Sequence, residues 1–287
     1  MRTGGRALRR RAVNAGVIVV AAGVASLAIA VLGWILAVVV SRGVSALDLQ
    51  FFTSLPAPPG MEGGGLANAI VGTLLLTLVA TLLAVPVGIL AGVWLVEFAG
   101  RSRLAHAVRF SVDILAGIPS ILVGLFTWGT IVVWTGSFSG WAGGVALAII
   151  MVPVVARTAE DMLGMVPDSL REAALALGAP RWRSLRVVFL AARNGLVTGV
   201  LLAIARVSGE TAPLLFTALN SPWWPRRLSE ATANLPVTIF NYAMSPWPDW
   251  QAKAWGASLL ITAGVLAVSL LARGLFGKDA RWKGRSA

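Results

Sequence analysis

Six long apolar stretches, separated by shorter polar segments, dominate the pattern of this chain. A helix needs about 20 apolar residues to cross the hydrocarbon core of a bilayer, and each stretch has or approaches that length. The pattern therefore predicts an all-α polytopic membrane protein. Its six transmembrane helices are expected at residues 15–40, 70–95, 110–133, 141–156, 193–216 and 254–271. Pro86 predicts a kink in the second helix.

Basic residues are distributed unevenly around these spans. Nineteen Lys and Arg residues lie in the N-terminal tail and in segments 100–109, 157–193 and 273–285, against four in the alternate segments. Basic residues accumulate on the cytoplasmic side of membrane proteins. We therefore expect a multi-pass protein of the cell inner membrane with both termini cytoplasmic. The uncharged run at 12–41 is too long for a cleaved signal peptide and predicts an uncleaved anchor.

The composition supports a membrane protein and excludes several other classes. The chain is 57% hydrophobic and 13% charged, whereas soluble domains carry about 25% charged residues. The net charge of +12 does not indicate nucleic-acid binding, because the basic residues flank apolar spans. No lysine follows the G-x-x-x-x-G-K-[ST] nucleotide-binding pattern, so we expect no ATPase activity and no cofactor in this chain. His106, the only histidine, lacks the neighbours of a metal site.

A short polar helix is predicted directly before the fifth span. Ser169 and Glu172 form the S-x-x-E pattern of a capping box, in which each side chain satisfies a backbone N–H at the helix start. Gly178 stands where a left-handed C-cap favours glycine, and Pro180 prevents continuation. Such a helix of about two turns is only marginally stable alone. It is either an ordinary surface helix or a docking element.

Arg206 and Glu210 lie inside the fifth span. Their spacing of four predicts a shared helix face, and an arginine at mid-membrane costs about 2.5–3.5 kcal/mol on insertion scales. One interpretation is a local ion pair that makes the span insertable. The other is a cation in an anion pathway, positioned by the carboxylate. Gly209 and Pro213 are expected to loosen the helix and free backbone N–H groups that an anion could use.

Three further charged positions lie near span ends. Arg157 follows the short fourth span and precedes Glu160 and Asp161. It is either an anchor whose side chain extends to the headgroups or part of the substrate path. Asp113 is expected to interact with the dipole of a helix start, and Glu97 to be an interface residue.

The external loop at 220–253 carries four tryptophans. Tryptophan is enriched at membrane interfaces, which is the ordinary explanation. The alternative is a docking surface for a substrate-binding protein. The residues concerned are Trp223, Trp224, Trp247 and Trp250.

The short helix resembles the EAA loop of ABC-importer permeases. Glu172-Ala173-Ala174, three residues and then Gly178 follow the motif, whereas Ala191 replaces the usual proline further on. That departure affects a helix start more than the docking face. The resemblance implies that these four residues form a coupling helix that enters a groove of a separate ATPase.

Two later strings are similar to PstA-type permeases of phosphate importers. The first is ARVSGETAPLL at 205–215, and the second begins ANLPVTIF at 233–240 and continues AMSP at 243–246. The resemblance extends over about 68–271. It implies that this chain forms half of a path for inorganic phosphate, with substrate-pathway residues Arg206, Glu210, Thr211 and Arg157.

The same resemblance implies a MetI-like permease core preceded by one extra helix. The expected partners are a PstC-type permease, a dimeric PstB-type ATPase that binds the ATP, a PstS-type phosphate-binding protein and membrane lipid. The expected segments are a basic cytoplasmic tail at 1–14, a transmembrane helix at 15–40, an external loop at 41–66, a permease domain at 67–275 and a second basic tail at 276–287. Within the permease domain lie a coupling loop at about 157–193 and an external loop at about 217–253.

Other functions remain open at this point. A permease for another oxyanion such as molybdate or sulfate, or one for a cation, would share most of the pattern. A secondary transporter should show paired half-repeats with matching broken helices, which are not apparent. A scaffold gives no reason for Arg206 and Glu210 inside a span.

Overall fold

The computed structural model describes residues 4–100 and 102–276. Within these residues the chain is helical apart from turns and one isolated β-bridge between Pro56 and Gly64. The first three residues of the predicted N-terminal tail and nearly all of the C-terminal tail lie outside them. The helices are α1 (Gly4–Gly43), η1 (Val44–Ala46), α2 (Leu49–Thr53), α3 (Ala67–Glu97), α4 (Arg103–Gly117), α5 (Ser120–Thr127), the π-helical turn η2 (Trp128–Val132), α6 (Val133–Thr135), α7 (Gly140–Gly164), α8 (Asp168–Ala176), α9 (Arg181–Val207), α10 (Ala212–Thr217), α11 (Leu235–Ala243) and α12 (Pro248–Phe276).

Five described helices are long and apolar enough to cross a membrane, namely α1, α3, α7, α9 and α12. A sixth span exists if α4 and the α5–α6 segment are counted together. These two parts are bent by 100° relative to each other, so the prediction of one helix over 110–133 is wrong. The bend follows from Pro119, which disfavours helical backbone at Ile118, and Ile118 is extended with ψ 130°.

The bundle is built around the close approach of α3 and α7. Gly88 and Gly92 are four residues apart on α3 and face α7; a Cβ added at Gly88 would lie 2.7 Å from the Cβ of Val155. One added at Gly92 would lie 2.5 Å from the Cβ of Ala159. Small residues at this spacing let membrane helices pack backbone to backbone. Pro86 lies inside α3 without ending it.

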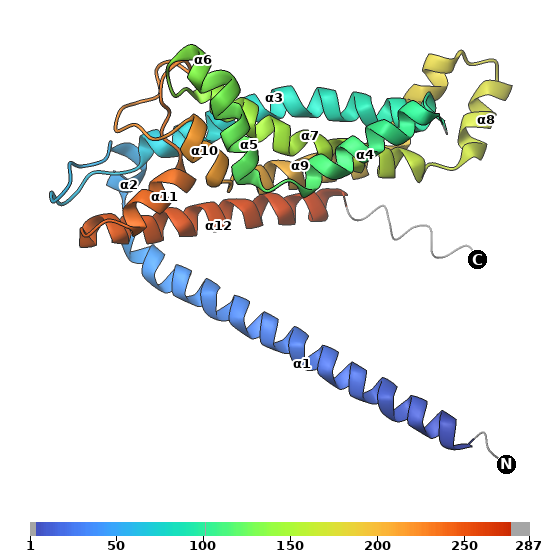
Figure 1. Ribbon diagram of the computed structural model, residues 1–287, viewed down its shortest axis with the longest axis horizontal. Helices are drawn as coiled ribbons and strands as arrows, with labels where there is room; N and C mark the ends of the chain where they lie inside the picture. The colour runs from blue at the N-terminus through green and yellow to red at the C-terminus, as the bar shows by residue number, and fades with distance from the viewer. Residues whose placement is uncertain (1–3, 101, 277–287) are drawn as a thin grey trace.

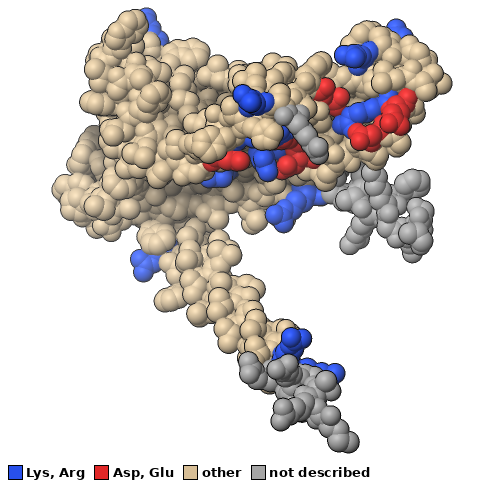
Figure 2. Space-filling view, turned by 45° about the vertical axis from the view of Figure 1, so that its right-hand side comes forward, with Lys and Arg blue, Asp and Glu red and all other residues tan. Residues whose placement is uncertain are grey.

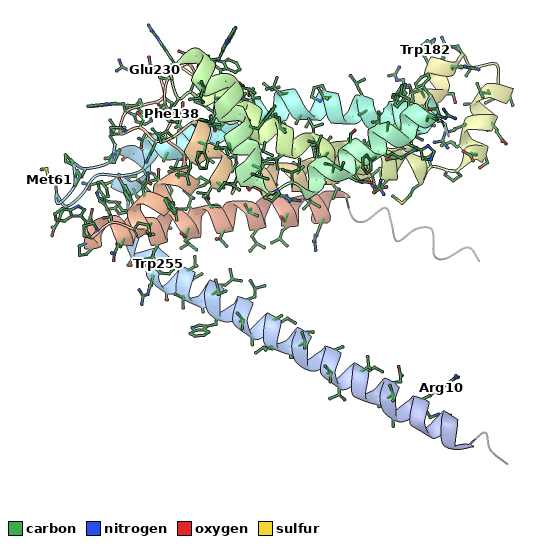
Figure 3. The ribbon with its side chains drawn as sticks, viewed as in Figure 1. Arg10, Met61, Phe138, Trp182, Glu230 and Trp255 are labelled. Carbon is green, nitrogen blue, oxygen red and sulfur yellow. The ribbon has the colours of Figure 1, made fainter. Side chains whose placement is uncertain are left out.

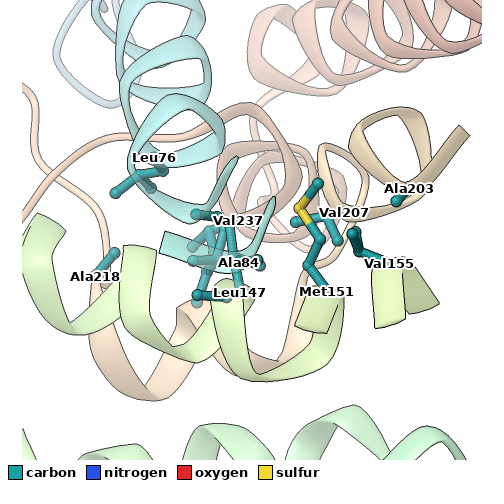
Figure 4. Close-up of a cluster of buried hydrophobic side chains, with 12 residues drawn as sticks. Leu76, Ala84, Leu147, Met151, Val155, Ala203, Val207, Ala218 and Val237 are labelled. Carbon is teal, nitrogen blue, oxygen red and sulfur yellow. The ribbon is translucent and has the colours of Figure 1, made fainter. Parts of the chain in front are cut away.

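The main core lies where α3, α7, α9, α10 and α11 meet (Figure 4). Its members are small or aliphatic side chains that are almost fully buried. Their burial packs α10 and α11 against the long helices, so that the second half of the fifth span is part of the packed bundle. Labelled members include Leu76, Ala84, Leu147, Met151, Val155, Ala203, Val207, Ala218 and Val237.

Helix α1 leaves this bundle (Figure 1). None of its most apolar 18-residue window is buried. It meets α12 only near its C-terminal end, where Gly43 packs on Leu259 and the Arg42 guanidinium lies 5.4 Å from the centre of the Trp255 ring (Figure 3). An apolar helix exposed all round is stable only in lipid or against another chain.

The longer connecting segments gather at two opposite ends of the bundle (Figure 1). Met61, Phe138 and Glu230 lie at one end, and Trp182, just after α8, lies at the other (Figure 3). This separation matches the predicted division into two groups of loops on opposite sides of a membrane.

Candidate functional site

The fifth span is interrupted at the residues predicted to form its charged centre. Helix α9 ends at Val207 and α10 begins at Ala212. Pro213 is in the first turn of α10, because proline suits a helix start and cannot continue one. Arg206 is therefore in the last turn of α9, and Glu210 lies in the break. The prediction of a shared helix face is wrong, and no ion pair joins the two among the described residues.

The Arg206 side chain is exposed. The hydrogen bonds and ion pairs of the described residues include none to its guanidinium. Its position at the C-terminal end of α9 is favourable for a cation because of the helix dipole. A guanidinium in this state can offer its paired donors to a carboxylate, sulfate or phosphate.

The backbone at the break is tighter than the glycine and proline content predicted. The Gly209 amide donates to the Arg206 carbonyl at 3.4 Å, and the Glu210 amide to the Val207 carbonyl at 3.1 Å. These two N–H groups are therefore engaged in a turn, whereas no backbone bond of the Thr211 amide is found among the described residues; the use of a free N–H group here by an anion stays a prediction. Glu210 and Thr211, which follow Arg206 after three intervening residues, are half-buried.

Arg157 has a different environment. Three carboxylates lie within 4 Å of its guanidinium, at 3.9 Å for Asp113, 3.8 Å for Glu160 and 3.7 Å for Asp161. The carboxylates compensate its charge, so Arg157 offers an anion a weaker field than Arg206 does.

The prediction that Asp113 lies at a helix start is wrong, because it lies in the second half of α4. It joins a charged network that ties α4 to α7, in which Arg109 pairs with Glu160 at 2.5 Å. Figure 2 shows acidic and basic side chains mixed toward the end of the molecule that carries α8, while most of the remaining visible surface is uncharged.

The predicted short helix exists as α8, but its start differs. It begins at Asp168 after Pro167, and the N-cap makes no side-chain hydrogen bond. The prediction of a capping box formed by Ser169 and Glu172 is therefore wrong, because Ser169 is already inside the helix. Asp168 places a negative charge in the first turn instead, where the helix dipole favours it.

The end of α8 agrees with the sequence. Gly178 has φ +78°, a left-handed conformation that side chains with a Cβ disfavour. The next helix, α9, begins at Arg181 and runs continuously through Ala191. Ala191 is thus in the middle of a helix, which corrects the expectation of a helix start there and lengthens the fifth span toward α8.

The motif residues of α8 are open to solvent. Glu172, Ala173 and Gly178 are exposed and Ala174 is half-buried. Leu177 is 89% exposed, and no residue of α8 is buried. A small, partly apolar surface of this kind is suited to entering a groove of another protein.

Arg171 is a residue that the sequence reasoning did not single out. It pairs with Glu97 at the end of α3 and donates to the carbonyls of Leu163, in the last turn of α7, and Val166, just after α7. The available signal was weak. Glu97 lies at the end of one apolar span, and Arg171 directly precedes the EAA motif 74 residues later, but nothing in the sequence indicates that the two are in contact.

At the opposite end of the bundle, the loops line an open cavity of about 590 Å³. Its lining includes Asn68, Tyr242 and Trp250, and the rings of Tyr242 and Trp250 are stacked with centroids 4.2 Å apart. Trp223 at its edge is 70% exposed. The prediction of a docking surface among these tryptophans stays a prediction.

Known proteins are similar to this chain in both sequence and fold. Residues 84–278 match the family model "Binding-protein-dependent transport system inner membrane component". The chain is 52% identical over 246 residues to the phosphate transport system permease protein PstA of Yersinia pestis, which covers 85% of this chain and 83% of that protein. It is 46% identical over 249 residues to PstA of Pasteurella multocida (strain Pm70), covering 86% and 89%.

In fold, the chain is similar to a chain of the MetNI methionine ABC transporter in an inward-facing conformation. The TM-score is 0.61 at 22% identity, over 74% of this chain and 95% of that chain. This likeness concerns the fold alone and confirms the predicted all-α, MetI-like core. The matches of sequence and fold agree with each other, and the chain therefore belongs to the family of binding-protein-dependent transport system inner membrane components, among the PstA-type permeases of ABC importers.

Proposed function

We propose that this chain is the transmembrane permease subunit of an ATP-driven importer of inorganic phosphate and forms half of its translocation path. The observation that carries the proposal is the identity of about half of all residues, over 85% of the chain, to a protein named for phosphate transport. The alternatives of another oxyanion or a secondary transporter have no comparable support.

Arg206 is the cation on which passage of the anion depends. It has no charge partner within the described residues, whereas three carboxylates surround Arg157. Phosphate presents several oxygens to the two parallel N–H groups of a guanidinium. Glu210 and Thr211 lie in the break that follows α9, and Glu210 keeps the binding weak enough for release. Arg157 acts later in the path, by exchanging one of its carboxylate partners.

The exposed face of α8, with Glu172, Ala173, Ala174 and Gly178, docks on the ATPase. ATP is bound and hydrolysed there, by a PstB-type dimer, and this chain carries no catalytic residue or cofactor of its own. The two nucleotide states drive transport only if they bind the inward- and outward-open forms of the permease with different affinity.

The remaining partners meet other surfaces. A PstC-type permease completes the path, and the exposed α1 and the open side of Arg206 are available to that chain and to lipid. A PstS-type binding protein delivers phosphate at the end that carries Trp223 and Trp250. Both termini and α8 are cytoplasmic, which the unequal distribution of basic residues supports.

Uptake of radiolabelled phosphate tests the proposal. The gene is expressed with its partner subunits in cells that lack their own phosphate importer, and uptake is followed at a fixed expression level. We expect uptake that is resistant to excess sulfate or molybdate and absent when the partner ATPase carries a substitution in its nucleotide-binding lysine. Sulfate or molybdate uptake in place of phosphate would overturn the substrate, and uptake without a working ATPase would overturn the transporter class.

A further inference from the structure

The coupling helix α8 is held to the membrane helices by few apolar contacts. None of its residues is buried, and an open cavity of about 660 Å³ lies beside it. Residues of three elements line this cavity, among them Met162 of α7, Ala173 of α8 and Gly195 of α9. A helix that is only marginally stable alone and that rests beside a cavity needs another link to the bundle.

Arg171 provides that link. Its Nε donates to Glu97 Oε1 at 3.0 Å, and its Nη2 donates to the Leu163 carbonyl at 3.1 Å. Its Nη1 donates to the Val166 carbonyl and to Asp168 Oδ1, both at 2.8 Å. The fork of one guanidinium thus joins α8 to the end of α3 and to the segment that ends α7.

Two features separate this contact from an ordinary surface ion pair. The side chains of Arg171 and Glu97 are only 18% and 16% exposed, so solvent screens their attraction less than it screens surface pairs. The contact also reaches both members of the most closely packed helix pair, α3 and α7, which approach through Gly88 and Gly92. Displacement of their ends therefore moves the pair as one unit.

We propose that Arg171 is a positioning residue for energy coupling, which makes the ends of α3 and α7 follow α8 when the ATPase moves it. This inference rests on the proposed function insofar as α8 is the element that the ATPase contacts. It does not depend on which oxyanion crosses the membrane. Glu97 is the acceptor across elements, whereas Asp168, which is 89% exposed and on α8 itself, is not part of the link.

The first test compares Glu97→Gln and Arg171→Gln with Asp168→Asn in the complete transporter reconstituted in liposomes. Glu97→Gln leaves only a neutral acceptor for Arg171 Nε, and Arg171→Gln removes the forked donors, so both variants lose the charge-assisted bond between α8 and α3. We expect uptake per ATP hydrolysed to fall by about fivefold or more in both. Hydrolysis itself should continue. Asp168→Asn, which removes the charge from a contact within α8 only, should retain the wild-type ratio.

A second measurement does not require transport. The chain has no cysteine, so spin labels can be placed at Ala176 of α8 and at Phe98, which is 64% exposed at the end of α3. In the otherwise unchanged complex, the distance between the labels should stay the same with and without ATP. In Arg171→Gln it should change with ATP, because α8 moves while α3 does not.

Three results would overturn the proposal. One is a wild-type ratio of uptake to hydrolysis in Glu97→Gln. Another is an equal loss in Asp168→Asn, which would show a general effect on α8. The third is a distance between the labels that responds to ATP in the same way with and without Arg171. If the unaltered complex carries no phosphate but the labels behave as expected, the substrate is wrong and the role of Arg171 stands.

Discussion

Replacement of Arg206 by glutamine removes one positive charge from the break between α9 and α10 while keeping a side chain of similar length. Arg206 has no ion-pair partner among the described residues, so the substitution leaves no carboxylate without its partner. It also lies in an exposed position of the last turn of α9, where glutamine is a good helix former. We therefore expect normal amounts of assembled complex and a selective loss of phosphate uptake.

The size of the loss depends on how closely the path encloses the anion. Unit charges about 4 Å apart attract each other by about 1 kcal/mol in water and about 4 kcal/mol at an effective dielectric of 20. In the isolated chain Arg206 is exposed, which corresponds to the lower value. A partner permease that encloses the path brings the attraction toward the higher value. Because 1.4 kcal/mol is a factor of ten, the expected fall in phosphate occupancy is between about fivefold and a thousandfold.

Initial rates of radiolabelled phosphate uptake, divided by the amount of complex and accompanied by ATP hydrolysis, measure this effect. Arg206→Lys keeps the charge and loses the paired donors, so it should retain partial uptake. Arg273→Gln is the matched control, since Arg273 is also an exposed arginine in the last turn of a helix. It should transport phosphate at the wild-type rate.

Two results would refute the reasoning. Wild-type uptake by Arg206→Gln would remove the residue from the path. Restored uptake in the double variant Arg206→Gln with Glu210→Gln would show that the two residues form an ion pair in the assembled transporter, and that the single variant failed because Glu210 lost its partner.

Three further predictions concern packing, coupling and topology. Gly92→Val introduces a Cβ 2.5 Å from α7 and should lower the free energy of unfolding of the purified protein by about 1–3 kcal/mol. Gly117→Ala, with nothing within 4 Å of the added Cβ, should leave it unchanged. Equal melting temperatures of the two variants would contradict this packing. Gly178→Val forces a β-branched residue to φ +78° at about 1–2 kcal/mol and should reduce copurification of the ATPase, so unchanged copurification and uptake would count against coupling through α8. Single cysteines at Ala176 and Ser229, both exposed, test the topology with an impermeant thiol reagent in intact cells. Only the cysteine at Ser229 should be labelled, and labelling at Ala176 in place of Ser229 would reverse the orientation.

The helical membrane class and the positions of most spans followed from the sequence, because the length of an apolar run and the charges beside it are local properties. An apolar run indicated each of α1, α3, α7, α9 and α12, although α9 begins before the predicted fifth span and ends inside it. Gly178 followed by Pro180 predicted the end of α8 for the same reason, since a left-handed residue and a missing N–H act on the chain where they stand. Short motifs also indicated the family, which the comparisons then showed.

Helix boundaries and bends were decided by several neighbouring preferences acting together. Pro119 ends a helix that hydrophobicity alone continues, and the result is a bend of 100°. Asp168, directly after Pro167, starts α8 before Ser169 can cap it. The break at 208–211 separates Arg206 from Glu210, although their spacing alone predicts a shared face. The spacing of apolar and charged residues indicates which side chains share a face within a helix, and it says little about the residue at which the helix ends.

Contacts between residues far apart in the chain were decided by the tertiary structure alone. Arg171 and Glu97 are 74 positions apart, and the carboxylates around Arg157 come from both α4 and α7. Which arginine keeps its charge available and which shares it with carboxylates depends on how the helices pack, through distances of a few ångströms. The sequence determined that charges lie inside or beside the membrane spans, and the packing of the helices determined what each of them contacts.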